Sequence, residues 1–340
     1  MITEPGQIYN ACFASLVRCL FTVSERCPDL PTNTPPLHRM RNLVQVLLFS
    51  APPPGEPPVD GLSLAHAITI LSTSQNLLAT LNEAGNEAGS EAASEAGATR
   101  LNEEMHQALT DTVGDLKSAL GAALRQKQAH RVRGLYVIID PEVTGGRDPL
   151  DIATAAINGG AKMLQLRDKL RDKGEVLALA IELQKLCHAN DADLIINDHA
   201  DVAAAVGSAG LHVGQTDLPV AEARKVLSPQ QVIGRSNHEM EELAQSQDMG
   251  ADHVAFGAIY ATGTKGVGRP PQGPDRVRRA KEMTQLPLVA IGGINAENVA
   301  PVVQAGADAI CVTAAVGLAP EPEAAAARLV EAIRDAGGPV

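Results

Sequence analysis

The sequence has no tryptophan and few other aromatic residues: phenylalanine, tyrosine and tryptophan together make up 2% of its 340 residues. Hydrophobic residues nevertheless account for 45% of the chain. A core made from this composition consists mainly of Ala, Val, Leu and Ile, as in parallel α/β proteins whose buried strands are aliphatic. The length predicts one large domain or two smaller ones.

Paired cysteines, excess positive charge and long apolar runs are also missing. The five cysteines form no C-x-x-C pair, which favours scattered thiols in a reducing compartment over a disulfide framework. The formal net charge of −12 argues against a nucleic-acid partner or an anionic membrane surface, although a local basic pocket for a phosphorylated metabolite remains compatible with it. No apolar run reaches the ~18 residues of a membrane helix, and the first residues do not resemble a signal peptide. We therefore expect a cytoplasmic protein.

The N-terminal part of the chain has helical periodicity. Apolar residues recur at helical spacing over residues 1–82, with a proline-rich connector at 51–58 and a third helix expected over 63–81. The residues that carry this pattern are Ile8, Cys12, Leu16, Leu20, Leu43, Val46 and Leu47. Residues 83–100 repeat Glu, Ala, Gly and Ser and are predicted to form an acidic linker, followed by a connecting helix over 101–130. We expect this all-helical extension to pack on the rest of the protein or to form a homodimer contact.

From residue 131 to residue 340 the pattern changes to alternating strands and helices. Eight aliphatic, β-branched runs are each followed by an Ala-rich amphipathic stretch, once after an intervening Gly-rich loop. The runs are LYVIID, KMLQLRD, DLIIND, GLHVG, QVIGRS, HVAFGAIY, PLVAIGG and AICVTAAV. Eight such units in about 200 residues predict an α/β fold of the (β/α)8 TIM-barrel class. A doubly wound sheet is the alternative, but no G-x-G-x-x-G follows the first strand.

Functional residues of a barrel lie at the carboxyl ends of its strands and on the loops that follow. At the end of the second strand, the alternation of side chains places Gln165, Arg167 and Lys169 on one side. Three nitrogen-bearing side chains that converge at a barrel mouth suit phosphate or pyrophosphate. A solvated strand end is the alternative interpretation.

Two aspartates, Asp198 and Asp217, follow the third and fourth strands. Carboxylates from neighbouring strands can hold one Mg²⁺ and leave coordination sites for phosphate oxygens. Each aspartate alone could equally be a helix N-cap. Because both lie beside the cationic second strand, the pair favours a metal site.

The remaining strand ends also carry polar groups. The fifth strand ends in a segment with Ser236 and His238, and the sixth leads into a loop with two hydroxyls and an ammonium whose composition suits a phosphate lid. Backbone amides after the seventh and eighth strands are placed to bind a monophosphate. The residues of that loop and of these turns are Thr262, Thr264, Lys265, Gly292, Gly293, Thr313 and Ala314. The sequence thus predicts a pyrophosphate site and a monophosphate site at one barrel mouth.

Six segments, in this order and spacing, closely resemble thiamine-phosphate synthase over about residues 134–335. They are QLRDK, NDHADVA, GQTDLP, GRSNH, the F-G-x-x-Y-x-T-x-T-K pattern and AIGGI. The resemblance implies a transferase that condenses a hydroxymethylpyrimidine pyrophosphate with a thiazole phosphate and releases pyrophosphate. In that family the C–O bond breaks first, and the thiazole nitrogen captures the pyrimidine-methyl cation.

The resemblance also implies residue roles. Mg²⁺ would bind Asp198 and Asp217, while Arg167, Ser236 and Lys265 would act in catalysis. The pyrimidine substrate and its pyrophosphate would contact Gln165, Arg167, Lys169, Asn197, Ser236 and Lys265. The thiazole phosphate would contact Thr262, Thr264, Gly292 or Gly293, Thr313 and Ala314.

The chain departs from the family at Thr313-Ala314, where the family has an apolar residue followed by serine. Two other functions stay open at this point. A thiazole tautomerase of the same lineage could use His238, but it would not need the aspartate pair. A degenerate barrel that serves as a binding module would not need the polar residues of the second strand.

Overall fold

A computed structural model describes residues 5–26, 34–48, 62–87, 101–263 and 270–340 of the chain. It divides into two compact units, Met1–Leu124 and Arg125–Val340. Among the described helices, none is both long enough and apolar enough to cross a membrane.

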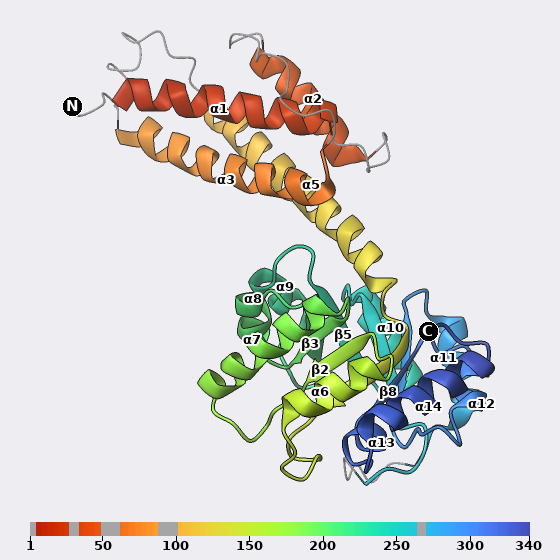
Figure 1. Cartoon of the computed structure of the whole chain (residues 1–340). Helices are drawn as coiled ribbons and strands as arrows, with labels where there is room; N and C mark the ends of the chain where they lie inside the picture. The colour runs from red at the N-terminus through yellow and green to blue at the C-terminus, as the bar shows by residue number, and fades with distance from the viewer. Residues whose placement is uncertain (1–4, 27–33, 49–61, 88–100, 264–269) are drawn as a thin grey trace. The chain divides into compact units, whose positions relative to one another are not determined.

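The first unit is helical in its described parts, as predicted (Figure 1). Its helices are α1 (Pro5–Arg26), α2 (Pro35–Leu48), α3 (Leu64–Glu87) and α5 (Glu103–Ala129). They share one apolar core, in which Leu16, Leu71 and Leu116 are completely buried. Apolar residues at three- and four-residue spacing form the buried stripe of these helices, and Tyr9 and Phe13 of α1 add aromatic rings to it.

The helical pattern through Leu43, Val46 and Leu47 is confirmed by α2, although Val46 is not on its buried face. The buried residues of α2 are Leu37, Met40, Val44 and Leu47, whereas Val46 is 49% exposed. The spacing of three, four and three residues defines the buried face, and Val46 lies outside it. Helix α3 extends beyond the predicted start of the linker at residue 83, and residues 88–100 of that linker lie outside the described residues.

The second unit is a closed barrel of parallel strands in the order β1 to β8, which confirms the predicted fold class. The strands are β1 (Gly134–Ile139), β2 (Met163–Leu166), β3 (Asp193–Asn197), β4 (Gly210–Val213), β5 (Val232–Asn237), β6 (His253–Gly257), β7 (Leu288–Ile291) and β8 (Ala309–Val312). Helices surround the strands (Figure 1). They are α6 (Pro149–Asn158), α7 (Lys173–Ala189), α8 (Ala200–Val206), α9 (Val220–Val226), α10 (Met240–Asp248), α11 (Gly273–Met283), α12 (Ala300–Gln304), α13 (Ala314–Gly317) and α14 (Pro322–Asp335).

Both faces of each barrel strand are buried, which explains the uninterrupted apolar runs in the sequence. On β1, Leu135, Val137 and Ile139 pack with the surrounding helices, while Tyr136 and Ile138 belong to a separate cluster inside the barrel. Alternate residues of one strand therefore supply two different cores.

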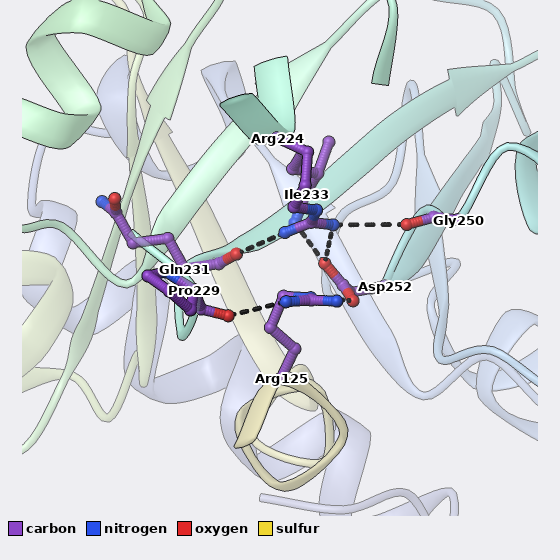
Figure 2. A network of polar contacts seen from close by, with 7 residues as sticks. All are labelled: Arg125, Arg224, Pro229, Gln231, Ile233, Gly250 and Asp252. Carbon is purple, nitrogen blue, oxygen red and sulfur yellow. Dashed lines mark hydrogen bonds and ion pairs between the residues drawn. The ribbon is translucent and has the colours of Figure 1, made fainter. Parts of the chain in front are cut away.

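The last turn of α5 belongs to the barrel unit, because Ala129 packs in the cluster inside the barrel. Figure 2 shows how this turn is attached: Nε of Arg125 lies 3.2 Å from a carboxylate oxygen of Asp252, and Nη1 donates to the carbonyl of Pro229 at 2.7 Å. The other oxygen of Asp252 accepts from Arg224 at 2.6 Å and from the backbone amide of Ile233 on β5 at 2.7 Å. The barrel unit thus starts at Arg125, six residues before the predicted position.

Burial and the neighbouring charge of Arg224 lower the pKa of Arg125, whereas Asp252 raises it. Two guanidinium groups share one carboxylate here, so removing Asp252 would leave two partly buried charges unpaired.

Candidate active site

A cavity of about 410 Å³ lies at the carboxyl ends of the barrel strands. Polar groups come from the ends of β1 to β6 and from the turns after β7 and β8, and aliphatic side chains cover much of the remaining wall. The polar and turn residues that line it are Tyr136, Asp140, Gln165, Arg167, Asn197, His212, Ser236, Asn237, His238, Thr262, Gly292, Gly293, Asn295, Thr313 and Ala314. The predicted residues Gln165, Arg167, Asn197, Ser236, Thr262, Gly292, Gly293, Thr313 and Ala314 are among them.

Arg167 supplies a positive charge to this cavity, and Asp140 holds its guanidinium in place. Nη1 of Arg167 pairs with the Asp140 carboxylate, whose side chain is 2% exposed, and lies 3.9 Å from Glu142. The other oxygen of Asp140 accepts from the backbone amide of Glu142 at 3.1 Å. The guanidinium is thus fixed before any ligand binds. Asp140 directly follows the β1 run, the same position that singled out Asp198, yet sequence reasoning did not select it.

Gln165 is held by a tyrosine inside the barrel. Its side-chain amide donates to the hydroxyl of Tyr136 at 2.8 Å, and both side chains are buried. Burial raises the pKa of Tyr136 well above its ordinary value, so the phenol stays protonated. Sequence reasoning missed Tyr136 because it reads as one more apolar residue of β1.

Ser236 is fixed from β4 and the loop after it. Its hydroxyl lies 2.8 Å from Nε2 of His212, and its carbonyl accepts from the side-chain amide of Gln215 at 2.6 Å. The oxygen of Gln215 in turn accepts from Arg235 at 2.6 Å. The hydroxyl of Ser236 therefore has a defined position at the cavity wall, set by neighbours that the sequence pattern did not identify.

Asp198 and Asp217 do not line the cavity, and neither caps a helix. The N-cap residues of α8 and α9 are His199 and Pro219, so the N-cap interpretation of both aspartates was wrong. One oxygen of Asp198 accepts from Lys169 at 2.6 Å, and one oxygen of Asp217 accepts from the backbone amide of Gly214 at 2.7 Å.

The donor set of these two residues fits a hard cation such as Mg²⁺. Each carboxylate is only partly buried and, within the described part of the chain, each has a second oxygen with no hydrogen bond. No group of three or more His, Cys, Asp or Glu side chains among the described residues could hold a metal, so an ion here would need substrate oxygens or water to complete its shell. Lys169 pairs with Asp198 and does not line the cavity.

The glycine pair after β7 brings backbone close to the segment after β6. Gly292 and Gly293 have φ values of +102° and +67°, which side chains rarely adopt. A Cβ on Gly292 would lie 2.5 Å from the Cβ of Ala258, and one on Gly293 would lie 2.5 Å from the carbonyl of Ala261. Glycine is required at both positions by space as well as by φ. Thr264 and Lys265 lie outside the described residues.

Comparisons with known proteins address the barrel. The family model described as "Thiamine monophosphate synthase" matches residues 135–316. The chain belongs to this family.

Individual members agree with that assignment. A thiamine-phosphate synthase of Shouchella clausii is 42% identical over 202 residues, which are 59% of this chain and 97% of the relative. One of Methanospirillum hungatei is 40% identical over 198 residues, or 58% of this chain and 96% of the relative. The solved thiamine phosphate pyrophosphorylase of Pyrococcus furiosus is 29% identical, covers 61% of this chain and 98% of its own, and superposes with a TM-score of 0.57.

The barrel is therefore that of a thiamine-phosphate synthase, a transferase of thiamine biosynthesis. None of these three relatives favours the thiazole tautomerase or the degenerate binding module. The alignment with the Shouchella clausii relative covers 59% of this chain, so about two fifths of the chain lie outside it.

Proposed function

We propose that the barrel transfers the methylene carbon of a hydroxymethylpyrimidine pyrophosphate to the ring nitrogen of a thiazole phosphate and releases pyrophosphate. The observation that carries this proposal is the composition of one cavity: Gln165, Arg167 and Asn197 on its β2–β3 side, and the turns after β7 and β8 on the other. An enzyme that joins a pyrophosphorylated compound to a phosphorylated one needs two such anion sites.

The side chain that faces the leaving pyrophosphate, Arg167, is in position before the substrate binds. Arg167 is fixed by Asp140, so its charge meets the negative charge that develops on the leaving oxygen with little rearrangement. Gln165, Asn197 and Ser236 would contact the pyrimidine or its pyrophosphate, and Lys169 and Lys265 would add positive charge. Asp198 and Asp217 would hold Mg²⁺, which neutralises charge on the pyrophosphate when bound.

The carbon–oxygen bond breaks before the carbon–nitrogen bond forms. Its electron pair leaves with pyrophosphate, and the resulting pyrimidine-methyl cation is captured by the lone pair of the thiazole nitrogen. Ile138, Val289 and Ile291 form an apolar wall of the cavity, which keeps water from competing for the cation. Thr262, Thr264 and the turns at Gly292–Gly293 and Thr313–Ala314 would hold the thiazole phosphate. No proton has to be moved.

The test is an assay of the purified chain with both precursors and Mg²⁺. We expect equimolar thiamine phosphate and pyrophosphate. Isomerisation of the thiazole precursor without condensation would indicate the tautomerase, and binding without any product would indicate the binding module. The partners of the reaction are small molecules, and a homodimer contact through the helical unit stays a prediction that size measurement in solution would check.

A further inference from the structure

His238 follows β5 and lines the cavity, yet the roles given above do not include it. Three contacts hold the residue. Its backbone amide donates to the Glu242 carboxylate at 2.6 Å, and its carbonyl accepts from the side chain of Gln272 at 2.9 Å. Ring atom Nδ1 lies 2.8 Å from the carbonyl oxygen of Gly257. Both the backbone and the ring orientation are therefore fixed.

The contact with Gly257 also determines the tautomer of the ring. A carbonyl oxygen can only accept, so Nδ1 carries the hydrogen and the neutral imidazole has its lone pair on Nε2. Within the described part of the chain, Nε2 has no hydrogen bond. His238 thus brings to the cavity a rigid ring whose remaining polar atom is an acceptor.

The side chains of Ser236 and Asn237, which precede His238 on the same strand end, form hydrogen bonds within the protein. The hydroxyl of Ser236 pairs with His212, as described above. The amide of Asn237 donates to the carbonyl of Arg235 at 2.8 Å, and its oxygen accepts from Ser246 at 2.5 Å. Of the three polar residues at this strand end, His238 alone has an acceptor atom left without a partner among the described residues.

We propose that Nε2 of His238 accepts a hydrogen bond from the exocyclic amino group of the pyrimidine. This inference rests on the proposed function, because it takes its substrates from there. Among the neutral groups of those substrates, the amino group is the one that can donate, since the ring nitrogens can only accept.

The contact strengthens as the reaction proceeds. When the carbon–oxygen bond breaks, positive charge spreads from the methylene carbon through the ring to the amino nitrogen, which makes its N–H a better donor. A neutral acceptor fixed beside that N–H therefore stabilises the transition state more than the ground state. The proton stays on the amino nitrogen throughout, so the stoichiometry of the reaction is unchanged.

The experiment compares the whole chain with its His238→Asn and His238→Gln variants. The Asn amide can still donate to Gly257 but does not reach the Nε2 position, whereas the Gln oxygen does. Calorimetry without thiazole phosphate measures Kd for the pyrimidine pyrophosphate and for an analogue with methyl in place of the amino group. The wild type should bind the amino compound about tenfold more tightly. The Asn variant should lose this preference, and the Gln variant should keep most of it.

Turnover supplies the second readout, with His188→Asn on the exposed end of α7 as the matched control. In His238→Asn, kcat should fall further than the affinity for the pyrimidine, while the control keeps wild-type values. Equal binding of both compounds by the wild type would overturn the proposal without any variant. So would a preference that survives in a folded Asn variant, or an equal weakening of both compounds. A wild type that prefers the amino compound but makes no thiamine phosphate would instead contradict the proposed function.

Discussion

The helical unit and the barrel unit both bury polar side chains, but in the barrel several of them donate to a different strand or helix. In the helices, Thr22 and Ser74 donate to the carbonyls four residues earlier, at 2.8 and 3.0 Å. In the barrel, Gln165 pairs with Tyr136 on a neighbouring strand, and Gln231 donates to the carbonyls of Ala203 and Ser208 at 2.7 and 2.9 Å. A hydrogen bond to a carbonyl of the same helix satisfies the hydroxyl but does not fix its position relative to another element. A hydrogen bond to another strand or helix does both. Chemistry is therefore expected in the barrel.

The largest effect should come from the aspartate pair. Asp198→Asn and Asp217→Asn should each lower kcat/KM by about 10²- to 10³-fold, because each removes a charged ligand for the cation that supports pyrophosphate departure. Steady-state kinetics across a Mg²⁺ titration measures this, and the Mg²⁺ concentration for half-maximal rate should rise. Asp201→Asn is the control, since its carboxylate is 58% exposed and pairs with Lys173. Unaltered Mg²⁺ dependence in both variants would refute the metal role.

A histidine inside the barrel should make this unit sensitive to acid. His253 is completely buried, and burial lowers its pKa to about 4, with the charge of Asp252 opposing the shift. Neither ring nitrogen has a hydrogen-bond partner within the described residues. A Cβ at position 234 would lie 2.1 Å from Nε2 of His253, so Gly234 provides the space for this ring.

Because the pKa of His253 is lower in the folded state, the unfolded chain binds the proton first as pH falls. The stability due to the neutral ring is complete above about pH 6.5 and is lost between about 6.5 and 4, by about 3 kcal/mol in total. His253→Leu should reduce the loss between pH 7 and pH 4.5 by about 2 kcal/mol, measured by denaturant unfolding of the barrel at the two pH values. Parallel pH profiles of the variant and the wild type would show that His253 is not the sensitive group.

Arg125 lies on α5 but belongs to the barrel unit. Arg125→Ala should destabilise the barrel by roughly 1–3 kcal/mol, since it removes a partly buried partner of Asp252 and the donor to Pro229. Arg39→Ala in the helical unit removes a surface pair with Asp115 whose side chains are 51% and 57% exposed, and should change stability by less than about 0.5 kcal/mol. Denaturant unfolding of both variants is the measurement. Equal effects would show that Arg125 contributes no more than a surface charge.

The smallest effect concerns the turn after β8. Ala314→Ser supplies the hydroxyl that the resemblance leads us to expect at this position, and it should lower KM for the thiazole phosphate by roughly threefold with little change in kcat, as one additional hydrogen bond to phosphate allows. Steady-state kinetics at saturating pyrimidine substrate measures it. If KM stays constant, the Thr313 hydroxyl or backbone amides already provide the contact.

Much of the barrel could be predicted from the sequence because its physical signals are local. A strand buried on both faces requires an aliphatic run, and the Gly292–Gly293 turn requires residues without side chains. The residues that position the site could not be predicted, because they depend on strand register: Tyr136 meets Gln165 and His212 meets Ser236 only once the barrel is closed.

We expect the barrel unit alone to carry the chemistry, which a fragment that starts at Arg125 can show. A fragment that starts one residue later would lack the pairing of Arg125 with Asp252. The Arg125–Val340 fragment should fold and form thiamine phosphate with kcat/KM within about threefold of the whole chain, with some loss of stability. A folded Arg125–Val340 fragment that binds both precursors but makes no product would contradict the account, because the helical unit would then be part of the enzyme's chemistry.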